Sequence, residues 1–193
     1  IYNGEIYNHD DLRNLLNNKY EFNTNSDAET ALYNYIEKGV YSFNDYNGMY
    51  AFAIYDNLKK TTYLVRDKTG EKPLYYVKGR DYFAFASEIK CLFEVVEPEF
   101  NEHAISYDAY EFTVGAETLF KNIYSLEPGE YLKITEGNYS KHEYWKLWDN
   151  LIEIEDNEKK IIKQLSELVE DSILLRTKNC VPNQDVLGST LDF

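Results

Sequence analysis

Two polar segments near the start of the chain carry side chains that could take part in the chemistry of an amide. The first segment is Asn3-Gly4-Glu5. An Asn-Gly pair is typical of a tight turn, which would expose a side-chain amide beside a backbone N–H. Two such donors can stabilise the oxyanion that develops during acyl transfer. A turn without any chemistry is the more common explanation of such a pair.

Asp27 is the second candidate, and it follows Ser26 in the segment Thr24-Asn25-Ser26-Asp27. Its carboxylate could bind an ammonium group of a substrate. Acidic residues in the first turn of a helix are common, however, and they usually only stabilise the helix. Neither segment taken alone therefore assigns a function.

Helical signals place Asp27 at the beginning of a helix. Ser26 and Glu29 have the Ser-x-x-Glu spacing of a capping box, which predicts a helix to about Lys38. Gly39 follows and is typical of the position just after a helix ends. Leucines at helical spacing predict an earlier helix over residues 10–18, with a short strand over 20–23 between the two helices.

Short strands joined by short links follow, which favours antiparallel pairing. The expected strands are 49–55, 61–65, 74–77 and 82–86, and a hairpin is expected from 130–134 and 139–144 around Gly137. Short helices are expected over 88–94 and from Asn101 to about Tyr110. This mixture predicts an α+β domain with sheets stacked face to face.

The pattern changes near residue 150. An acidic linker over 145–155 precedes a long amphipathic helix over 158–178, which Pro182 closes. We therefore expect one domain over residues 1–148 and the beginning of a second over 149–193.

Composition limits the classes of function. The net charge of −14 disfavours binding to nucleic acid or to an anionic membrane surface. No apolar run reaches the length of about 18 residues that a membrane span needs. Cys91 and Cys180 are far apart, which favours a reducing cytoplasm over a disulfide framework, and Cys91 is expected to be a small buried residue. The three histidines are scattered and expected at the surface, and no metal site is expected.

Taken together, six collinear segments resemble the glutaminase domain of asparagine synthetases, a class II glutamine amidotransferase domain. The segments are 3–8, 24–27, 47–53, 66–76, 85–90 and 126–129. The resemblance covers residues 1 to about 145. It implies an N-terminal-nucleophile (Ntn) fold, a four-layer αββα sandwich of two antiparallel sheets, followed by the start of an α/β synthetase domain.

The resemblance also implies residue roles. In that family an N-terminal cysteine thiolate attacks the side-chain amide of glutamine, with its own α-amine as the base. Asn3 and Gly4 would form the oxyanion hole, while Glu5 and Asp27 would bind the α-ammonium of glutamine. The chain begins with Ile1, and the family's cysteine lies several dozen residues further upstream. We therefore expect a fragment that does not hydrolyse glutamine alone.

The end of the chain resembles the pyrophosphate-binding loop Leu-Ser-Gly-Gly-Leu-Asp-Ser of the family's synthetase domain. The sequence here is Leu187-Gly188-Ser189-Thr190-Leu191-Asp192-Phe193. Leu187 and Asp192 match and are candidate nucleotide contacts. Thr190 departs from the pattern, because a β-branched side chain is stiff where a backbone must approach phosphate.

The parent protein is then expected to use ATP and Mg²⁺ to amidate aspartate with ammonia from glutamine, whereas no cofactor is expected for the fragment. The resemblance allows a homodimer. Two alternatives stay open. One is an amidotransferase of the same architecture that acts on another carboxylate or on a sugar precursor, and the other is a non-catalytic glutamine-binding module.

Overall fold

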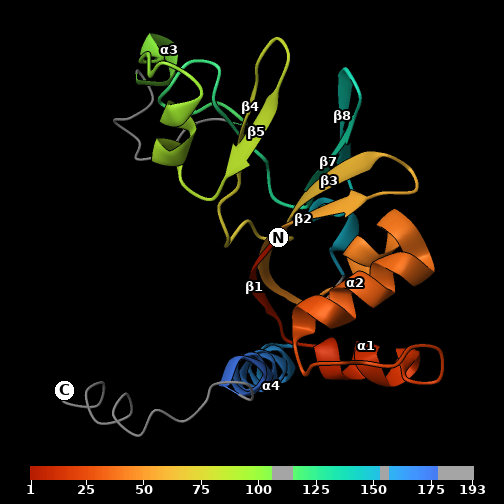
Figure 1. The fold of residues 1–193 in the computed structure, drawn as a ribbon. Helices are drawn as coiled ribbons and strands as arrows, with labels where there is room; N and C mark the ends of the chain where they lie inside the picture. The colour runs from red at the N-terminus through yellow and green to blue at the C-terminus, as the bar shows by residue number, and fades with distance from the viewer. Residues whose placement is uncertain (106–114, 153–156, 178–193) are drawn as a thin grey trace, which may run out of the picture. The chain divides into compact units, whose positions relative to one another are not determined.

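A computed structural model describes residues 1–105, 115–152 and 157–177 (Figure 1). The chain divides into two compact units, Ile1–Asp149 and Asn150–Phe193. In the described part of the chain, every strand belongs to the first unit, and the second unit contains the long helix α4 (Glu158–Thr177). The assignment of residues 149–193 to a separate synthetase domain stays a prediction.

The first unit contains two antiparallel sheets. The five-stranded sheet has the order β1-β2-β3-β7-β8 and the three-stranded sheet has the order β5-β4-β6. Their strands are β1 (Tyr2–Ile6), β2 (Gly48–Asp56), β3 (Thr61–Arg66), β4 (Tyr75–Lys78), β5 (Phe83–Ala86), β6 (Tyr124–Ser125), β7 (Glu130–Thr135) and β8 (Asn138–Glu143). The helices are α1 (His9–Leu16), α2 (Asp27–Lys38) and α3 (Glu102–Ile105), and the 3₁₀ segments are η1 (Gly39–Asp45), η2 (Ile89–Glu94) and η4 (Trp148–Asn150).

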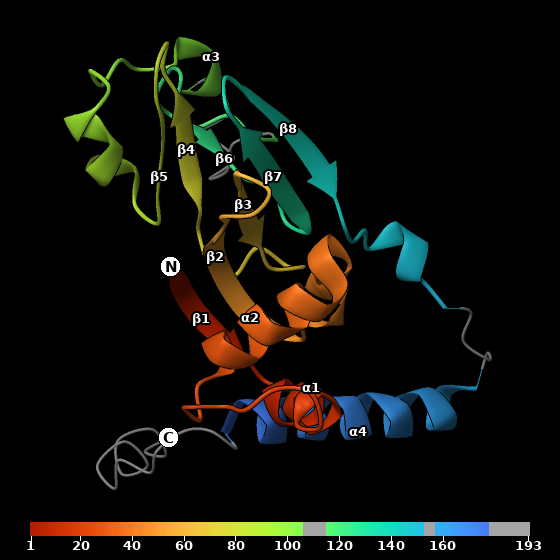
Figure 2. The ribbon, with the colours of Figure 1, turned by 45° about the vertical axis from the view of Figure 1, so that its right-hand side comes forward.

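Alternating side chains on the strands separate the layers. Tyr50 and Phe52 of β2 belong to the core shared with α1, α2 and η1, whereas Ala51 belongs to the core between the two sheets. A third core lies between the outer face of the second sheet and η2. Helices therefore cover both outer faces of a stacked pair of sheets, and α2 lies beside β1 and β2 (Figure 2). The predicted α+β fold with two antiparallel sheets is confirmed.

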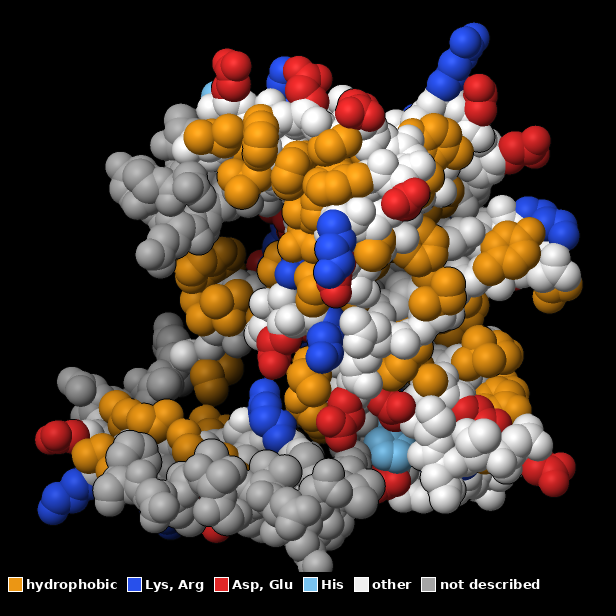
Figure 3. Space-filling model, turned by 60° about the vertical axis from the view of Figure 1, so that its left-hand side comes forward, with side chains coloured by type: hydrophobic (Ala, Val, Ile, Leu, Met, Phe, Trp, Pro, Cys, Tyr) orange, Lys and Arg blue, Asp and Glu red, His pale blue; other side chains and the backbone are white. Residues whose placement is uncertain are grey.

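The layer outside the second sheet is thin. Several large hydrophobic side chains around it stay exposed, among them Tyr82, Val95 and Phe100. Figure 3 shows hydrophobic side chains gathered in the upper part of the view, with acidic and basic side chains dispersed around them. The short segment η2 therefore covers this sheet only in part.

The core beneath α2 is rich in aromatic residues, most of them tyrosines. Rings pack mainly edge to face, as between Tyr46 and Tyr50 with centroids 5.7 Å apart. The hydroxyls find partners inside the core. Tyr46 donates to the carbonyl of Ala31 over 3.0 Å, and the hydroxyls of Tyr50 and Tyr144 lie 3.0 Å apart. A tyrosine can thus bury its ring while its polar end stays bonded.

The link from the first sheet to the second is built on Arg66 and Asp67. The Arg66 guanidinium donates to the carbonyl oxygens of Gly70, Lys72 and Leu126. Asp67 is fully buried and accepts from the backbone N–H groups of Tyr50, Thr69, Glu71 and Lys72, at 3.2, 3.1, 2.9 and 2.9 Å. These bonds satisfy the polar backbone of a turn that would otherwise be buried without partners.

Most expected elements are confirmed. These are the helices over 10–18, 26–38 and 158–178, the short helix over 88–94 (formed as the 3₁₀ segment η2), the four strands between residues 49 and 86, and the hairpin around Gly137. Asn101 accepts from the N–H of Ala104 over 3.4 Å and precedes α3. The remainder of that expected helix falls in 106–114, outside the described residues.

The expected turn at Asn3-Gly4 is wrong, because both residues lie inside strand β1. Asn3 is opposite Ala51 and Gly4 is opposite Tyr50. Gly4 has φ +147°, which side chains rarely adopt, and a Cβ there would lie 2.1 Å from the carbonyl oxygen of Met49. The glycine is therefore needed for a close strand pair and not for a turn.

Other corrections concern the region around α1 and the cysteine of η2. No strand forms over 20–23. Instead, Tyr20 stacks on Tyr33 of α2 with centroids 4.7 Å apart, and Phe22 packs edge to face against the same ring at 5.0 Å. His9 is not a surface residue, since its side chain is only 12% exposed. Cys91 is exposed instead of buried.

Replacing Asp67 tests the link between the sheets. We expect Asp67→Asn to lower the free energy of unfolding by about 3 kcal/mol, because an amide nitrogen would face N–H donors that need an acceptor. Urea denaturation of the variant measures this loss. Asp81→Asn, at an exposed position, is the matched control and should change stability by less than about 0.5 kcal/mol. Equal stability of the two variants would contradict this role.

Glu29 gives the fold a dependence on pH. It accepts from the N–H groups of Asn23 and Thr24 at 2.9 and 2.8 Å and from the Thr24 hydroxyl at 2.6 Å. These bonds, those from the Asn23 backbone foremost, lower the pKa of Glu29 from 4.5 to about 2. Glu29 therefore contributes stability above pH 4.5 that is lost as the pH falls through 2. Between pH 2 and pH 4.5, the free energy of unfolding should change less with pH for Glu29→Gln than for the wild type. An equal change in the two proteins would contradict the assignment.

Candidate functional site

Strand β1 carries three of the candidate residues at the edge of the five-stranded sheet. Asn3 is exposed, and its side-chain nitrogen lies 3.4 Å from the hydroxyl of Ser87, just after β5. This contact is longer than a typical hydrogen bond and directs Asn3 toward the second sheet. Tyr2 and Ile6 instead pack into the aromatic core beneath α2. Strand β1 thus directs Asn3 away from the aromatic core and packs Tyr2 and Ile6 into it.

The backbone of β1 alternates between its two edges. Ile1 and Ala53 exchange hydrogen bonds in both directions, and the N–H of Tyr7 donates to Asn47, so odd-numbered residues face β2. The N–H of Ile6 points the other way. The same alternation indicates that the N–H of Gly4 lies on the outer edge of β1, where no strand is paired within the described residues.

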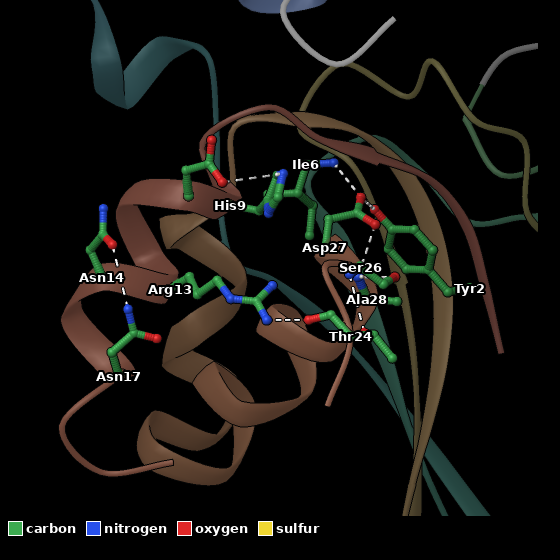
Figure 4. A network of polar contacts seen from close by, with 11 residues as sticks. Tyr2, Ile6, His9, Arg13, Asn14, Asn17, Thr24, Ser26, Asp27 and Ala28 are labelled. Carbon is green, nitrogen blue, oxygen red and sulfur yellow. Dashed lines mark hydrogen bonds and ion pairs between the residues drawn. The ribbon is translucent and has the colours of Figure 1, made fainter. Parts of the chain in front are cut away.

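Asp27 fastens the beginning of helix α2 to this outer edge (Figure 4). Its Oδ2 accepts from the Tyr2 hydroxyl at 2.5 Å and from the N–H of Ile6 at 2.8 Å. Its Oδ1 accepts from the N–H of Ala28 at 2.9 Å, and the Ser26 hydroxyl caps the same N–H at 3.2 Å. The helix N-terminus further favours a negative charge at this position. Asp27 is therefore held in one orientation against β1.

The helix start itself differs in detail from the expected capping box. Ser26 does accept a bond from the helix, but Glu29 bonds to Asn23 and Thr24 and not to the N–H of Ser26. The carboxylate of Glu29 thereby fixes the loop that leads into α2. Glu29 therefore helps to position Asp27 but is not itself part of the candidate site.

Tyr2 is the residue that sequence reasoning missed. Its hydroxyl donates to Asp27, and the negative charge of Glu5 acts on it as well. Burial, followed by the bond that the hydroxyl donates to Asp27 and by the two negative charges, raises the pKa of Tyr2 far above its usual value. The hydroxyl therefore stays protonated and donates. The signal in the sequence was weak, since only the apolar body and polar tip of tyrosine pointed to such a position.

The charge balance of the site is negative. Within the described residues, no lysine, arginine or histidine forms an ion pair with Glu5 or Asp27. Carboxylates that have no such partner in the described part of the chain form a place where a small cation would be stabilised. The structure holds Asp27 against β1, the strand that carries Asn3, Gly4 and Glu5.

Leu187, Asp192 and Cys180 lie outside the described residues. In the described ranges, no group of three His, Cys, Asp or Glu side chains could hold a metal ion. None of the helices searched, all from the described part of the chain, is long and apolar enough to cross a membrane.

The chain is similar in sequence to known proteins. The model of a family described as "Glutamine amidotransferase domain" matches residues 1–145. A putative glutamine-hydrolysing asparagine synthetase 2 of Methanocaldococcus jannaschii is 33% identical over 100% of this chain and 38% of its own length. The glutamine-hydrolysing asparagine synthetase 1 of Bacillus subtilis is 33% identical over 100% of this chain and 31% of its own. The chain thus spans about a third of these relatives.

A solved structure shows the same fold. The glutamine phosphoribosylpyrophosphate amidotransferase of B. subtilis, complexed with ADP and GMP, aligns with a TM-score of 0.55. It is 23% identical and covers 75% of this chain and 28% of its own. The predicted Ntn-type fold is thereby confirmed. Because the family model matches most of its length, the chain belongs to the glutamine amidotransferase domain family.

Proposed function

We propose that the first unit is the glutaminase domain of a glutamine-dependent asparagine synthetase. The support is the family match together with relatives named as glutamine-hydrolysing asparagine synthetases along the whole chain. In this proposal the domain releases ammonia from glutamine, and the parent protein uses it with ATP and Mg²⁺ to amidate aspartate. Leu187 and Asp192 are the proposed nucleotide contacts. A homodimer and a cytoplasmic location belong to the same proposal.

The observation that carries the proposed site is that two carboxylates, Glu5 and Asp27, have no cationic partner among the residues that the structure describes. The α-ammonium of glutamine is a cation of suitable size for two acidic groups. A carboxylate offers about four lone-pair positions, and three of those on Asp27 are used by Tyr2, Ile6 and Ala28. One position on Oδ1 remains for a substrate, and Glu5 supplies the second contact.

Asn3 and Gly4 are the proposed oxyanion hole. When a thiolate from outside this chain attacks the amide carbon, the carbonyl oxygen becomes negative. The side-chain nitrogen of Asn3 and the N–H on the outer edge at Gly4 can then donate to that oxygen. The nitrogen takes the proton that the α-amine of the nucleophile accepted from its thiol and leaves as ammonia, a glutamyl thioester remains, and water then releases glutamate and the free thiol. Binding of the α-ammonium at one end of glutamine positions the amide carbon at the other end for attack.

Removing one negative charge from the pair tests this proposal in the full-length protein. Glu5→Gln and Asp27→Asn should each lower kcat/KM for glutamine at least about tenfold, mainly through KM, because an ionic contact to the substrate is lost. Asparagine formation from added ammonia should be unchanged, since that route does not use the glutaminase site. Steady-state kinetics with the two nitrogen donors measures both.

The matched control is Glu136→Gln, an exposed residue in the β7–β8 turn, for which both rates should equal those of the wild type. An unchanged glutamine KM in Glu5→Gln and Asp27→Asn would reject the proposed substrate site. A parallel loss of the ammonia-driven rate would instead show that the substitutions damage the protein as a whole, which also contradicts the proposed role.

A further inference from the structure

Tyr2 connects the aromatic core to the acidic pair. Its ring packs against Phe52, with centroids 6.2 Å apart and planes inclined by 23°. The core therefore fixes the ring, and the fixed ring places the hydroxyl. That hydroxyl donates to Oδ2 of Asp27 over 2.5 Å, a short bond for a phenol and a carboxylate.

The hydroxyl determines which part of the Asp27 carboxylate is left for a ligand. Oδ2 receives two donors, the Tyr2 hydroxyl and the N–H of Ile6. Oδ1 receives one donor, the N–H of Ala28. Without the hydroxyl, one lone pair of Oδ2 would be free and the carboxylate could turn about its terminal bond, which is a soft rotation. With the Tyr2 hydroxyl in place, only Oδ1 of Asp27 is available to a ligand.

The charge state of the hydroxyl also matters. Burial, the bond to Asp27 and the negative charges of Asp27 and Glu5 raise the pKa of Tyr2, so the hydroxyl stays protonated. A neutral donor at this point orients a carboxylate without cancelling its charge, whereas a lysine or arginine would occupy the place of a substrate cation. Tyrosine thus fixes Asp27 and leaves the site negative.

We propose that Tyr2 is a positioning residue for substrate recognition, which holds Asp27 so that Oδ1 and the Glu5 carboxylate converge on the α-ammonium of glutamine. This inference rests on the proposed function. It predicts that the hydroxyl acts through Asp27 and has no independent effect on binding.

A double-mutant cycle in the full-length protein tests this dependence. Tyr2→Phe keeps the ring in the core and should raise the KM for glutamine about five- to tenfold, with kcat and the ammonia-driven rate within about twofold of the wild type. In the Asp27→Asn background, adding Tyr2→Phe should cause no further rise, because the carboxylate that it positions is already lost. Thermal unfolding of each variant shows whether the fold is kept.

Tyr35→Phe is the matched control. Tyr35 lies in the same core, and its hydroxyl also donates to a carboxylate, that of Asp56 at 2.9 Å, at the far end of β2. Its removal should leave the glutamine KM unchanged. If Tyr35→Phe raises KM as much as Tyr2→Phe, the effect is a general loss of core stability and the inference is wrong.

The outcomes separate this inference from the proposed function. If Asp27→Asn raises KM while Tyr2→Phe does not, or if their effects simply add, the role of Tyr2 is overturned and the substrate site stands. If neither Asp27→Asn nor Glu5→Gln changes KM, the substrate site itself is rejected, and the inference about Tyr2 is rejected with it.

Discussion

The bond between the Asp27 carboxylate and the outer edge of β1 is the constraint on which the site depends. It joins the first residue of α2 to the backbone of Ile6 and to the hydroxyl of Tyr2. A helix and a strand separated by 21 residues are thereby fixed at one point. Because Glu5 lies on the same strand, this bond also sets where the second negative charge stands relative to the first.

The rest of the first unit supports that point. The aromatic core holds β1 and α2 together, and its tyrosines bury their rings while their hydroxyls stay bonded. Arg66 and Asp67 hold the link between the two sheets, so the end of β5 with Ser87 can lie near Asn3. Burial of large side chains supplies most of the stability. The buried bonds of Arg66 and Asp67 determine a single arrangement of the sheets.

Much of the fold was predictable from the chain because local signals agreed with it. The leucine spacing, the start of α2 at Ser26 and the glycine of the β7–β8 turn all act over a few residues. The pairing of β3 with β7 was not predictable, since no local pattern joins strands so far apart in sequence. The sequence of Asn3-Gly4 predicts a turn instead of a strand, because the close approach of β2, which requires Gly4, is visible only in three dimensions. The role of Tyr2 likewise needs the position of Asp27.

A crystal structure of the full-length protein with glutamine bound, and with its nucleophile inactivated, would show directly whether Asp27 and Glu5 hold the substrate. We expect the α-ammonium nitrogen to lie about 2.7–3.2 Å from Oδ1 of Asp27 and from a carboxylate oxygen of Glu5. We also expect the Tyr2 hydroxyl to keep its bond to Oδ2. Glutamine bound with its ammonium away from both carboxylates, or an Asp27 that remains bonded only to the protein, would contradict this site.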